Sequence, residues 1–382
     1  AQAAWLKRGR RRRGMADFTA LVGEDAARRL QERLAVHRPN AIQAEALPLA
    51  LGGADVALVA QTGSGKTLAF LLPLLARLRS GGAGLVLAPT PELAAQHARV
   101  AAALGGPASL QCTTPAALLA AEGEERGRFA VVALDEVDAL VFGPSGAALT
   151  PEAAALLAAL TERQRPQFLL ATAHLTAAQR TALLPLFPGV QVVQHRSANG
   201  TTGVLVPTLR QVSHHFSGDG AAKLAKLRSV LQDAPKDLAG GSTLVFCADA
   251  EEAERVGAYL QQQHGPALLL HDGLPPDARR AALEAFRAGE CRCLVASGVA
   301  ARGLDLPEVR HVVLFDVPRD VPGFLHRVGR TARAGAVGQV TSLMCGGAGA
   351  FGQYTDLYAL SDAPKLEFAK PEARTLEAEN KS

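Results

Sequence analysis

The feature that most constrains the fold is a glycine-rich turn between an apolar run and a helical stretch. Residues 54–60 are apolar apart from Asp55 and lead into Ala60-Gln61-Thr62-Gly63-Ser64-Gly65-Lys66-Thr67. Residues 67–78 then follow a helical pattern. A strand, a glycine turn and a helix in this order are typical of a phosphate-binding loop. The glycines let successive N–H groups and the helix N-terminus face a polyphosphate. The sequence therefore predicts a nucleoside triphosphate site formed by Thr62, Gly63, Ser64, Gly65, Lys66 and Thr67.

Two side chains of this loop and two acidic residues form a candidate hydrolytic centre. Lys66 supplies a charge for the β- and γ-phosphates, and the Thr67 hydroxyl can hold Mg²⁺. Asp135 follows the apolar run 129–133. A carboxylate at the end of a neighbouring strand is the expected second Mg²⁺ partner. Glu136, one residue on, is expected to orient and polarise the attacking water.

Composition excludes several classes of protein. The 382 residues suffice for two domains with cores, and 48% hydrophobic with 20% charged residues is typical of a globular chain. No apolar run reaches the roughly 20 residues that a membrane span requires. The five cysteines have no zinc-ligand spacing, so buried thiols in a reducing compartment are expected.

Residues 1–16 contain no acidic residue and six basic ones, Lys7, Arg8, Arg10, Arg11, Arg12 and Arg13. Such a block is either an arm that grips RNA or what remains of an Arg-rich organelle-targeting segment. The sequence favours the mitochondrion as location, with the nucleus or cytosol as alternatives.

Apolar strand-like runs alternate with helical patterns, which predicts parallel sheets covered by helices on both faces. The expected first-domain strands are 55–60, 84–88, 129–134, 168–172 and 190–193, and the expected helices are 41–51, 66–79, 91–104, 151–163 and 175–186. The predicted organisation is a basic arm (1–16), a first α/β domain (17–196), a linker (197–209), a second α/β domain (210–345) and a tail (346–382).

A second segment with candidate functional residues is His326-Arg327-Val328-Gly329-Arg330-Thr331-Ala332-Arg333-Ala334-Gly335. Arg330 and Arg333 are three apart, so on a helix they would share one face. Two guanidinium groups suit a phosphoryl group that gains charge in the transition state. Because they belong to the second domain, hydrolysis would depend on domain closure.

Taken in order, these motifs resemble the DEAD-box RNA helicases over residues 17–345. The resemblance rests on Pro39-Asn40-Ala41-Ile42-Gln43, on the loop 60–67, on Asp135-Glu136-Val137-Asp138, on 271–279, on Ala300-Ala301-Arg302-Gly303-Leu304-Asp305 and on 326–335. It implies two tandem RecA-like domains, each a mostly parallel sheet with helices on both faces, and ATP with Mg²⁺ as cofactors.

The resemblance also implies roles for further residues. Gln43 would clasp the adenine edge, Phe18 would stack on the base, and Asp305 would contact the ribose. Coupling between hydrolysis and RNA would involve Asp138, Thr172 and His326, with His326 relaying to Asp138. RNA would be contacted by Thr90, Thr114 and Arg302.

Several positions depart from the family pattern. Pro91 replaces an arginine that grips RNA, Ala116-Ala117 replaces Gly-Arg, and Leu170 replaces the serine of Ser-Ala-Thr. Ser297-Gly298 replaces Thr-Asp, and Ala332 replaces a glycine. The segment between Gly106 and Thr114 is also too short for the helix and strand that the family has there.

The resemblance implies an ATP-dependent RNA helicase that closes on ATP and single-stranded RNA and reopens after hydrolysis. The departures favour an alternative, a weakly active or inactive ATP-holding RNA clamp such as a ribosome-assembly factor. A DNA helicase with the same two-domain core is a third candidate. The expected partner is RNA with little sequence preference, structured or ribosomal, and the core is expected to be monomeric.

Overall fold

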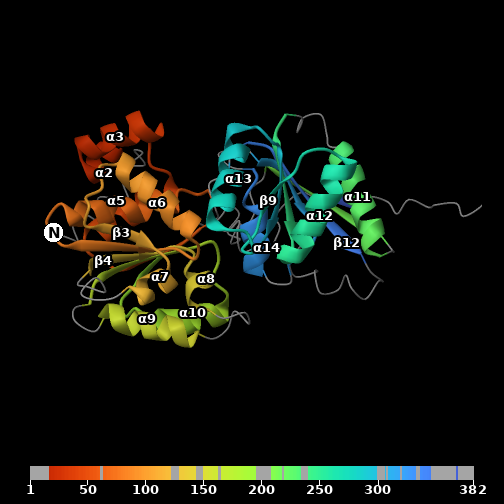
Figure 1. The fold of residues 1–382 in the computed structure, drawn as a ribbon. Helices are drawn as coiled ribbons and strands as arrows, with labels where there is room; N and C mark the ends of the chain where they lie inside the picture. Colours follow the sequence, from red (N-terminus) through yellow and green to blue (C-terminus); the bar gives the residue numbers. More distant parts are fainter. Residues whose placement is uncertain are drawn as a thin grey trace, which may run out of the picture. The chain divides into compact units, whose positions relative to one another are not determined.

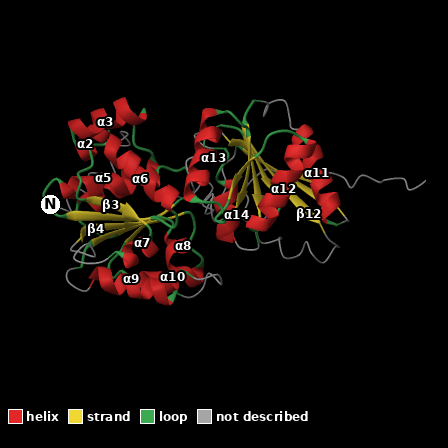
Figure 2. Ribbon diagram, in the orientation of Figure 1, coloured by secondary structure: helices red, strands yellow, loops and turns green. Residues whose placement is uncertain are grey.

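The structure is a computed structural model that describes residues 17–60, 63–121, 129–142, 149–161, 165–194, 208–216, 219–233, 240–298, 306, 309–318, 321–332, 336–345 and 367–368. The chain divides into two units, Ala1–Ala60 with Ser64–His195 and Gln61–Gly63 with Arg196–Ser382. Each unit has a parallel sheet with helices on both faces, which confirms the predicted fold class (Figures 1 and 2).

The described sheet of the first unit has the strand order β3-β2-β4-β5-β1-β6. Its strands are β1 (Val56–Val59), β2 (Ala83–Leu87), β3 (Leu110–Thr113), β4 (Phe129–Leu134), β5 (Gln167–Thr172) and β6 (Gln191–Gln194). Every residue of β1 is buried, as are nearly all of β4 and β5. Central strands covered on both faces need apolar side chains on both, which is why they read as continuous apolar runs.

Helices cover both faces of this sheet (Figure 1). One face carries α2 (Phe18–Val22), α3 (Glu24–Leu34), α4 (Ala41–Leu51), α5 (Lys66–Leu78) and α6 (Pro91–Ala103). The other carries α7 (Pro115–Ala120), α8 (Val137–Val141), α9 (Pro151–Thr161), α10 (Ala177–Leu183) and the 3₁₀ turn η2 (Leu184–Leu186). The first unit therefore has two apolar layers, one on each side of the sheet.

The second unit repeats this plan with the described strand order β13-β7-β12-β11-β8-β10-β9. Its strands are β7 (Leu209–Phe216), β8 (Ser242–Cys247), β9 (Leu268–Leu270), β10 (Cys293–Ser297), β11 (Val309–Leu314), β12 (Gly338–Cys345) and β13 (Glu367–Phe368). Helices α13 (Pro276–Ala288) and α14 (Val321–Val328) pack on one face, and α11 (Gly220–Gln232) and α12 (Ala250–Gln263) on the other.

Four features of the fold differ from the sequence prediction. The short segment before Thr114 does contain a strand, β3, which pairs in parallel with β2, so only a helix is missing there. The predicted tail contributes β13, which pairs with β7. Helices α2, α3, α7 and α8 were also not predicted. The helix expected over 175–186 ends at Leu183, because Pro185 interrupts its hydrogen bonds.

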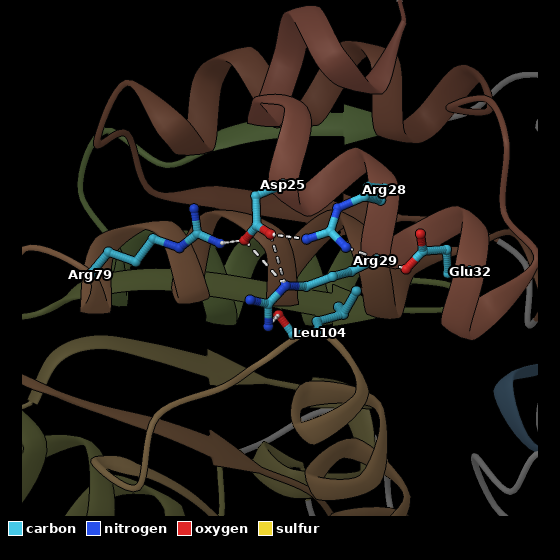
Figure 3. Close-up of polar contacts among 6 residues, drawn as sticks. All are labelled: Asp25, Arg28, Arg29, Glu32, Arg79 and Leu104. Carbon is cyan, nitrogen blue, oxygen red and sulfur yellow. Dashed lines mark hydrogen bonds and ion pairs between the residues drawn. The ribbon is translucent and has the colours of Figure 1, made fainter.

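A polar cluster fastens α3 to the rest of the first unit (Figure 3). Asp25 accepts from Arg28 at 2.9 Å and contacts Arg29 at 3.1 Å and Arg79 at 3.2 Å. These side chains are largely exposed, so each ion pair contributes little stability. Arg29 also donates to the Leu104 carbonyl at 3.4 Å, at the end of α6.

The turn after α6 depends on Gly105. Its φ is +78°, and a Cβ there would lie 1.6 Å from Arg29 Nη1. Glycine adopts this left-handed backbone without strain, and any other residue would also force the Arg29 guanidinium to move. The chain therefore turns at once from α6 toward β3, without an intervening helix.

A buried histidine makes the second unit sensitive to acid. His311 Nε2 lies 2.8 Å from Thr341 Oγ1, and burial lowers the pKa of His311 from 6.5 to about 4. The unfolded chain therefore binds more protons than the folded chain between these values. Above pH 6.5 the neutral His311 has no effect on the free energy of unfolding. As the pH falls from 6.5 toward 4, protonation of the unfolded chain lowers the free energy of unfolding by up to about 3 kcal/mol.

We therefore expect His311→Leu to flatten the loss of stability between pH 6.5 and 4, as measured by urea denaturation. His264→Leu, at an exposed position on α12's end, is the matched control and should keep the parental slope. An unchanged slope in His311→Leu would show that another group titrates.

Candidate phosphate-binding and hydrolytic site

The candidate residues of the first unit follow neighbouring parallel strands at one edge of its sheet. Thr114 follows β3, Thr90 follows β2, Asp135 follows β4, Thr172 ends β5, and the glycine-rich loop follows β1. Ligand sites in open parallel sheets lie at the carboxyl ends of the strands. The fold therefore collects these residues on the edge where a ligand is expected.

The loop before α5 has the backbone of an anion cradle. Gly63 and Gly65 both have φ +81°, and α5 begins at Lys66 with no side chain capping its first N–H groups. Ser64 Oγ is buried and has no hydrogen-bond partner among the described residues. Lys66 Nζ donates to the Ala60 carbonyl at the end of β1. Uncapped N–H groups and an unsatisfied hydroxyl fit a phosphate group.

The residues before α4 hold the loop in place. Asn40 and Gln43 form a capping box, in which Gln43 N donates to Asn40 Oδ1 at 3.1 Å and Asn40 N to Gln43 Oε1 at 3.0 Å. Asn40 Nδ2 donates to the Ser64 carbonyl at 2.7 Å, and Gln43 Nε2 to the Gly65 carbonyl at 3.0 Å. The loop conformation is thus fixed by two side-chain amides.

The close approach of these amides makes Gly65 sensitive to substitution. A Cβ at Gly65 would lie 2.4 Å from Gln43 Nε2 and 2.5 Å from Asn40 Nδ2. Gly65→Ala should displace both amides and strain the backbone, lowering stability by about 2 kcal/mol and weakening triphosphate binding. Gly53→Ala is the matched control, because Gly53 has φ +86° with nothing near its Cβ.

Thermal unfolding and titration with a fluorescent triphosphate analogue measure the two effects. Gly53→Ala should lower the melting temperature through backbone strain alone, and it should leave the affinity for the triphosphate analogue unchanged. Equal binding by both variants would contradict a role for the amide brace.

The two acidic residues lie at the start of α8. Asp135 N donates to the Leu87 carbonyl of β2 at 3.0 Å, and Asp135 Oδ1 accepts from Glu136 N at 2.9 Å. Burial opposes the charge of Asp135, but contacts with His97, Lys66 and the Glu136 N–H outweigh it and hold the pKa of Asp135 below its ordinary value. Asp135 is therefore an ionised carboxylate at neutral pH. Glu136 is buried, and its backbone lies in the left-handed region with φ +50°.

Asp138 is joined to the end of β5. Thr172 Oγ1 lies 2.7 Å from Asp138 Oδ1 and 3.0 Å from the His174 carbonyl, and both Thr172 and Asp138 are buried. The Ala60 N–H donates to the Thr172 carbonyl at 3.1 Å. Hydrogen bonds thus link the acidic turn to the end of β5, and the end of β5 to the start of the phosphate loop.

Sequence reasoning missed His97, which contacts Asp135. His97 Nε2 lies 2.9 Å from Asp135 Oδ2, and the ring is fully buried. The available signal was its position on α6, where it shares a buried face with Leu93, Ala94 and Ala101. A histidine at helical spacing among apolar residues was a visible anomaly.

Thr90 and Thr114, predicted to contact RNA, both cap helices. Thr90 Oγ1 accepts from Leu93 N, and Thr114 Oγ1 from Ala117 N, each at 3.3 Å. A proline at the first helical position follows each threonine, where its missing N–H is tolerated. Pro91 thus starts α6 where the family has arginine. RNA contact by the two threonines stays a prediction.

Phe18 packs in the core of the first unit with 1% of its surface exposed. No face of its ring is open to a base in this arrangement. The predicted stacking on adenine stays untested.

The arginine-rich motif of the second unit differs from the helix that we expected. Helix α14 ends at Val328, and Arg330 lies in the turn after it, so a helix face shared with Arg333 was the wrong reason to pair them. Arg330 is buried and donates from Nε to the His326 carbonyl at 3.0 Å. Ala332 has φ +55°, which explains why the family has glycine there.

Gly298, where the family has an aspartate, lies against the guanidinium of Arg327. A Cβ at Gly298 would lie 2.5 Å from Arg327 Nη2, so this guanidinium fills the space. Arg327 Nη1 in turn donates to the Asp316 carbonyl at 2.7 Å. The predicted site residues Thr62, Arg302, Asp305 and Arg333 lie outside the described residues.

Among the described residues, no group of three or more His, Cys, Asp or Glu is placed to hold a metal ion. A divalent cation would thus rely on Thr67, Asp135, water and the ligand's own phosphates. In the same part of the chain, no helix has the length and apolar character needed to cross a membrane.

Comparison with known proteins agrees with this geometry. Residues 40–126 match the family described as DEAD/DEAH box helicase, and residues 222–335 match the helicase conserved C-terminal domain. The DBP8 ATP-dependent RNA helicase of Candida albicans is 33% identical over 348 residues, which cover 82% of this chain and 78% of that protein. The RRP3 ATP-dependent rRNA helicase of Pyricularia oryzae is 34% identical over 344 residues, but the chain spans only 61% of its length.

Solved structures share the fold. S. cerevisiae Dbp5 bound to RNA and ADP BeF3 superimposes with a TM-score of 0.78 at 22% identity, covering 91% of this chain and 94% of that one. Mss116p bound to ssRNA and AMP-PNP gives 0.79 at 20% identity, covering 94% and 80%. Tandem RecA-like domains are therefore confirmed. With a phosphate loop, an acidic turn on the same sheet edge and these relatives, the chain belongs to the DEAD-box helicase family.

Proposed function

We propose that this protein is an ATP-dependent RNA helicase, or RNA-remodelling ATPase, that closes its two domains on ATP and a single RNA strand. The observation that carries the proposal is the ionised Asp135 beside Glu136 at the same sheet edge as the uncapped phosphate loop. A polyphosphate site next to two carboxylates suits hydrolysis of a phosphoanhydride.

The loop and the Gln43 brace support ATP as the nucleotide. Gln43 uses one N–H and one oxygen lone pair within the described residues. One N–H and one lone pair remain, which complement N7 and the N6 amino group of adenine. Thr62, Gly63, Ser64, Gly65 and Lys66 would hold the phosphates, and Asp305 the ribose.

Thr67 and Asp135 would hold Mg²⁺, which neutralises phosphate charge when bound. Glu136 would orient water, since it is buried beside Asp135 and its backbone is fixed by the bond to Asp135 Oδ1. Arg330 and Arg333 would complete the site from the second domain. Hydrolysis would then require closure.

RNA is the proposed partner, supported by relatives whose names are RNA and rRNA helicases. ATP and RNA would both favour the closed state, so each would tighten binding of the other. Contacts with phosphates and 2′-hydroxyls would give little sequence preference and a steep salt dependence. Ribosomal RNA within an assembly complex is the proposed client, for a monomeric core. The mitochondrion remains our proposal for location.

An ATP-holding RNA clamp with weak or no unwinding is the second candidate. Leu170 is 1% exposed and packs in the core beside α8–α10, so the hydroxyl that the family places there is replaced by apolar packing. Thr172 and its bond to Asp138 remain. Loss of the hydroxyl with retention of the acidic turn favours turnover without strand release.

Two assays on the same protein separate these functions. We expect RNA to stimulate ATP turnover and expect a short RNA duplex to be released. Turnover without release would favour the clamp, and stronger activation by DNA would favour a DNA helicase. Absence of both nucleotide binding and turnover would overturn the proposal.

A further inference from the structure

A buried histidine contacts the carboxylate proposed to hold Mg²⁺. His97 projects from α6, with Nε2 2.9 Å from Asp135 Oδ2. The contact has the distance of an ion pair but does not meet the geometry of a hydrogen bond. The ring forms a T-shaped contact with Phe70 of α5, with 5.4 Å between ring centroids and 78° between the ring planes. The ring of His97 on α6 is therefore packed against α5, and its Nε2 lies next to the Asp135 carboxylate.

The contact leaves neither oxygen of Asp135 without a neighbour. Oδ1 accepts from Glu136 N at 2.9 Å, and Oδ2 faces His97. Two contacts on different oxygens define the plane of a carboxylate, whereas a single contact would leave it free to rotate. The position of the metal-binding lone pairs is thus set by His97 as well as by the backbone.

Packing alone does not account for a histidine at this position. The other buried residues of α6 are Leu93, Ala94 and Ala101, and a leucine would fill the same space without burying two polar nitrogens. Both ring nitrogens of His97 are buried without a well-aligned hydrogen bond within the described structure, so the 2.9 Å contact with Asp135 Oδ2 is the polar contact that Nε2 has there.

We propose that His97 is a positioning residue that orients the Asp135 carboxylate for the Mg²⁺ of bound ATP. The inference rests on the proposed ATPase function and deepens it. Residues that orient a metal ligand without touching the metal commonly change metal affinity or activity by about 10–100-fold. His97 acts through Asp135 and has no contact with the nucleotide in this assignment.

The test measures the Mg²⁺ requirement of nucleotide binding in the full chain. A fluorescent ATP analogue is titrated at a series of Mg²⁺ concentrations and in EDTA. His97→Leu should raise, by about 10-fold or more, the Mg²⁺ concentration at which half of the Mg²⁺-dependent gain in affinity for the ATP analogue is reached. It should leave the affinity measured in EDTA unchanged. His97→Gln, which keeps an N–H donor of similar reach, should restore the parental requirement. His311→Leu removes a buried histidine from the other unit and should not change it.

A double mutant tests whether His97 acts through Asp135. In an Asp135→Asn background, His97→Leu should have no further effect on the Mg²⁺ requirement, because the two effects are not additive. If His97→Leu does not fold, as judged by thermal denaturation, His97→Met takes its place as the variant without a donor.

Three outcomes would overturn the inference. They are a parental Mg²⁺ requirement in the variant without a donor, a His97→Gln variant as impaired as that variant, and additive effects in the double mutant. A parental protein that binds no nucleotide with or without Mg²⁺ would instead overturn the proposed function.

Discussion

Lys66→Ala is expected to weaken ATP binding roughly 100-fold or more, because in the proposed site its ammonium group would make charge-assisted hydrogen bonds to two phosphates, each contributing about 1.5–3 kcal/mol. Lys66 stands at the first position of α5, whose N–H groups have no side-chain cap. Its ammonium group donates to the Ala60 carbonyl, so the Lys66 side chain lies along the phosphate loop. The measurement is equilibrium titration with ATP, and RNA-stimulated turnover should be lost in parallel.

Arg79→Ala provides the matched control for Lys66→Ala. Arg79 caps the other end of α5 and is 55% exposed, paired with Asp25 (Figure 3). Removing this cation should leave ATP affinity unchanged. The melting temperature without nucleotide should be similar in both variants. If Lys66→Ala binds ATP as the parent does, the loop is not the phosphate site.

The sheets and the phosphate loop could be predicted because their residues have few alternatives. Central strands such as Val56–Val59 are buried on both faces, so they must be apolar throughout. Gly63 and Gly65 both have φ +81°, a backbone conformation that favours glycine. These constraints act on the chain locally, and local constraints are visible in a single sequence.

The missed elements lack such local constraints. Strand β3 (Leu110–Thr113) is half-buried at the sheet edge and includes glutamine and threonine, so it shows no apolar run. Strand β13 has two residues and exists only by pairing with β7. Tertiary pairing, and not local propensity, creates both strands.

The site was predicted as far as its motifs are contiguous. Asp135 and Glu136 lie where they were expected, after β4. His97 was missed because it is 38 positions away in sequence from Asp135 and meets it only through the packing of α6 on the sheet. Helix α14 ends at Val328 because a turn anchored by Thr331 Oγ1 on the Val309 carbonyl replaces further helix, and no local signal in the sequence shows this turn. Contacts of this kind require the fold.

Glu136→Gln is expected to lower ATP turnover about 10²–10⁴-fold, the usual contribution of a positioned general base, with little change in ATP affinity. The substitution keeps the shape of the side chain, and the backbone bond to Asp135 Oδ1 remains. Asp135 would still be held for the metal. Because hydrolysis reopens the domains in the proposed cycle, the variant should also retain RNA in the presence of ATP.

Glu45→Gln makes the same chemical change at an exposed position on α4 and is the matched control. Its turnover and RNA release should match the parent. Turnover is measured with saturating RNA, and retention by competition with unlabelled RNA. Slow turnover with persistent RNA retention would separate Glu136, as the water-orienting group, from Lys66, whose loss removes binding itself. A parental rate in Glu136→Gln would mean that another group activates water, and the left-handed turn at φ +50° would then serve only to start α8.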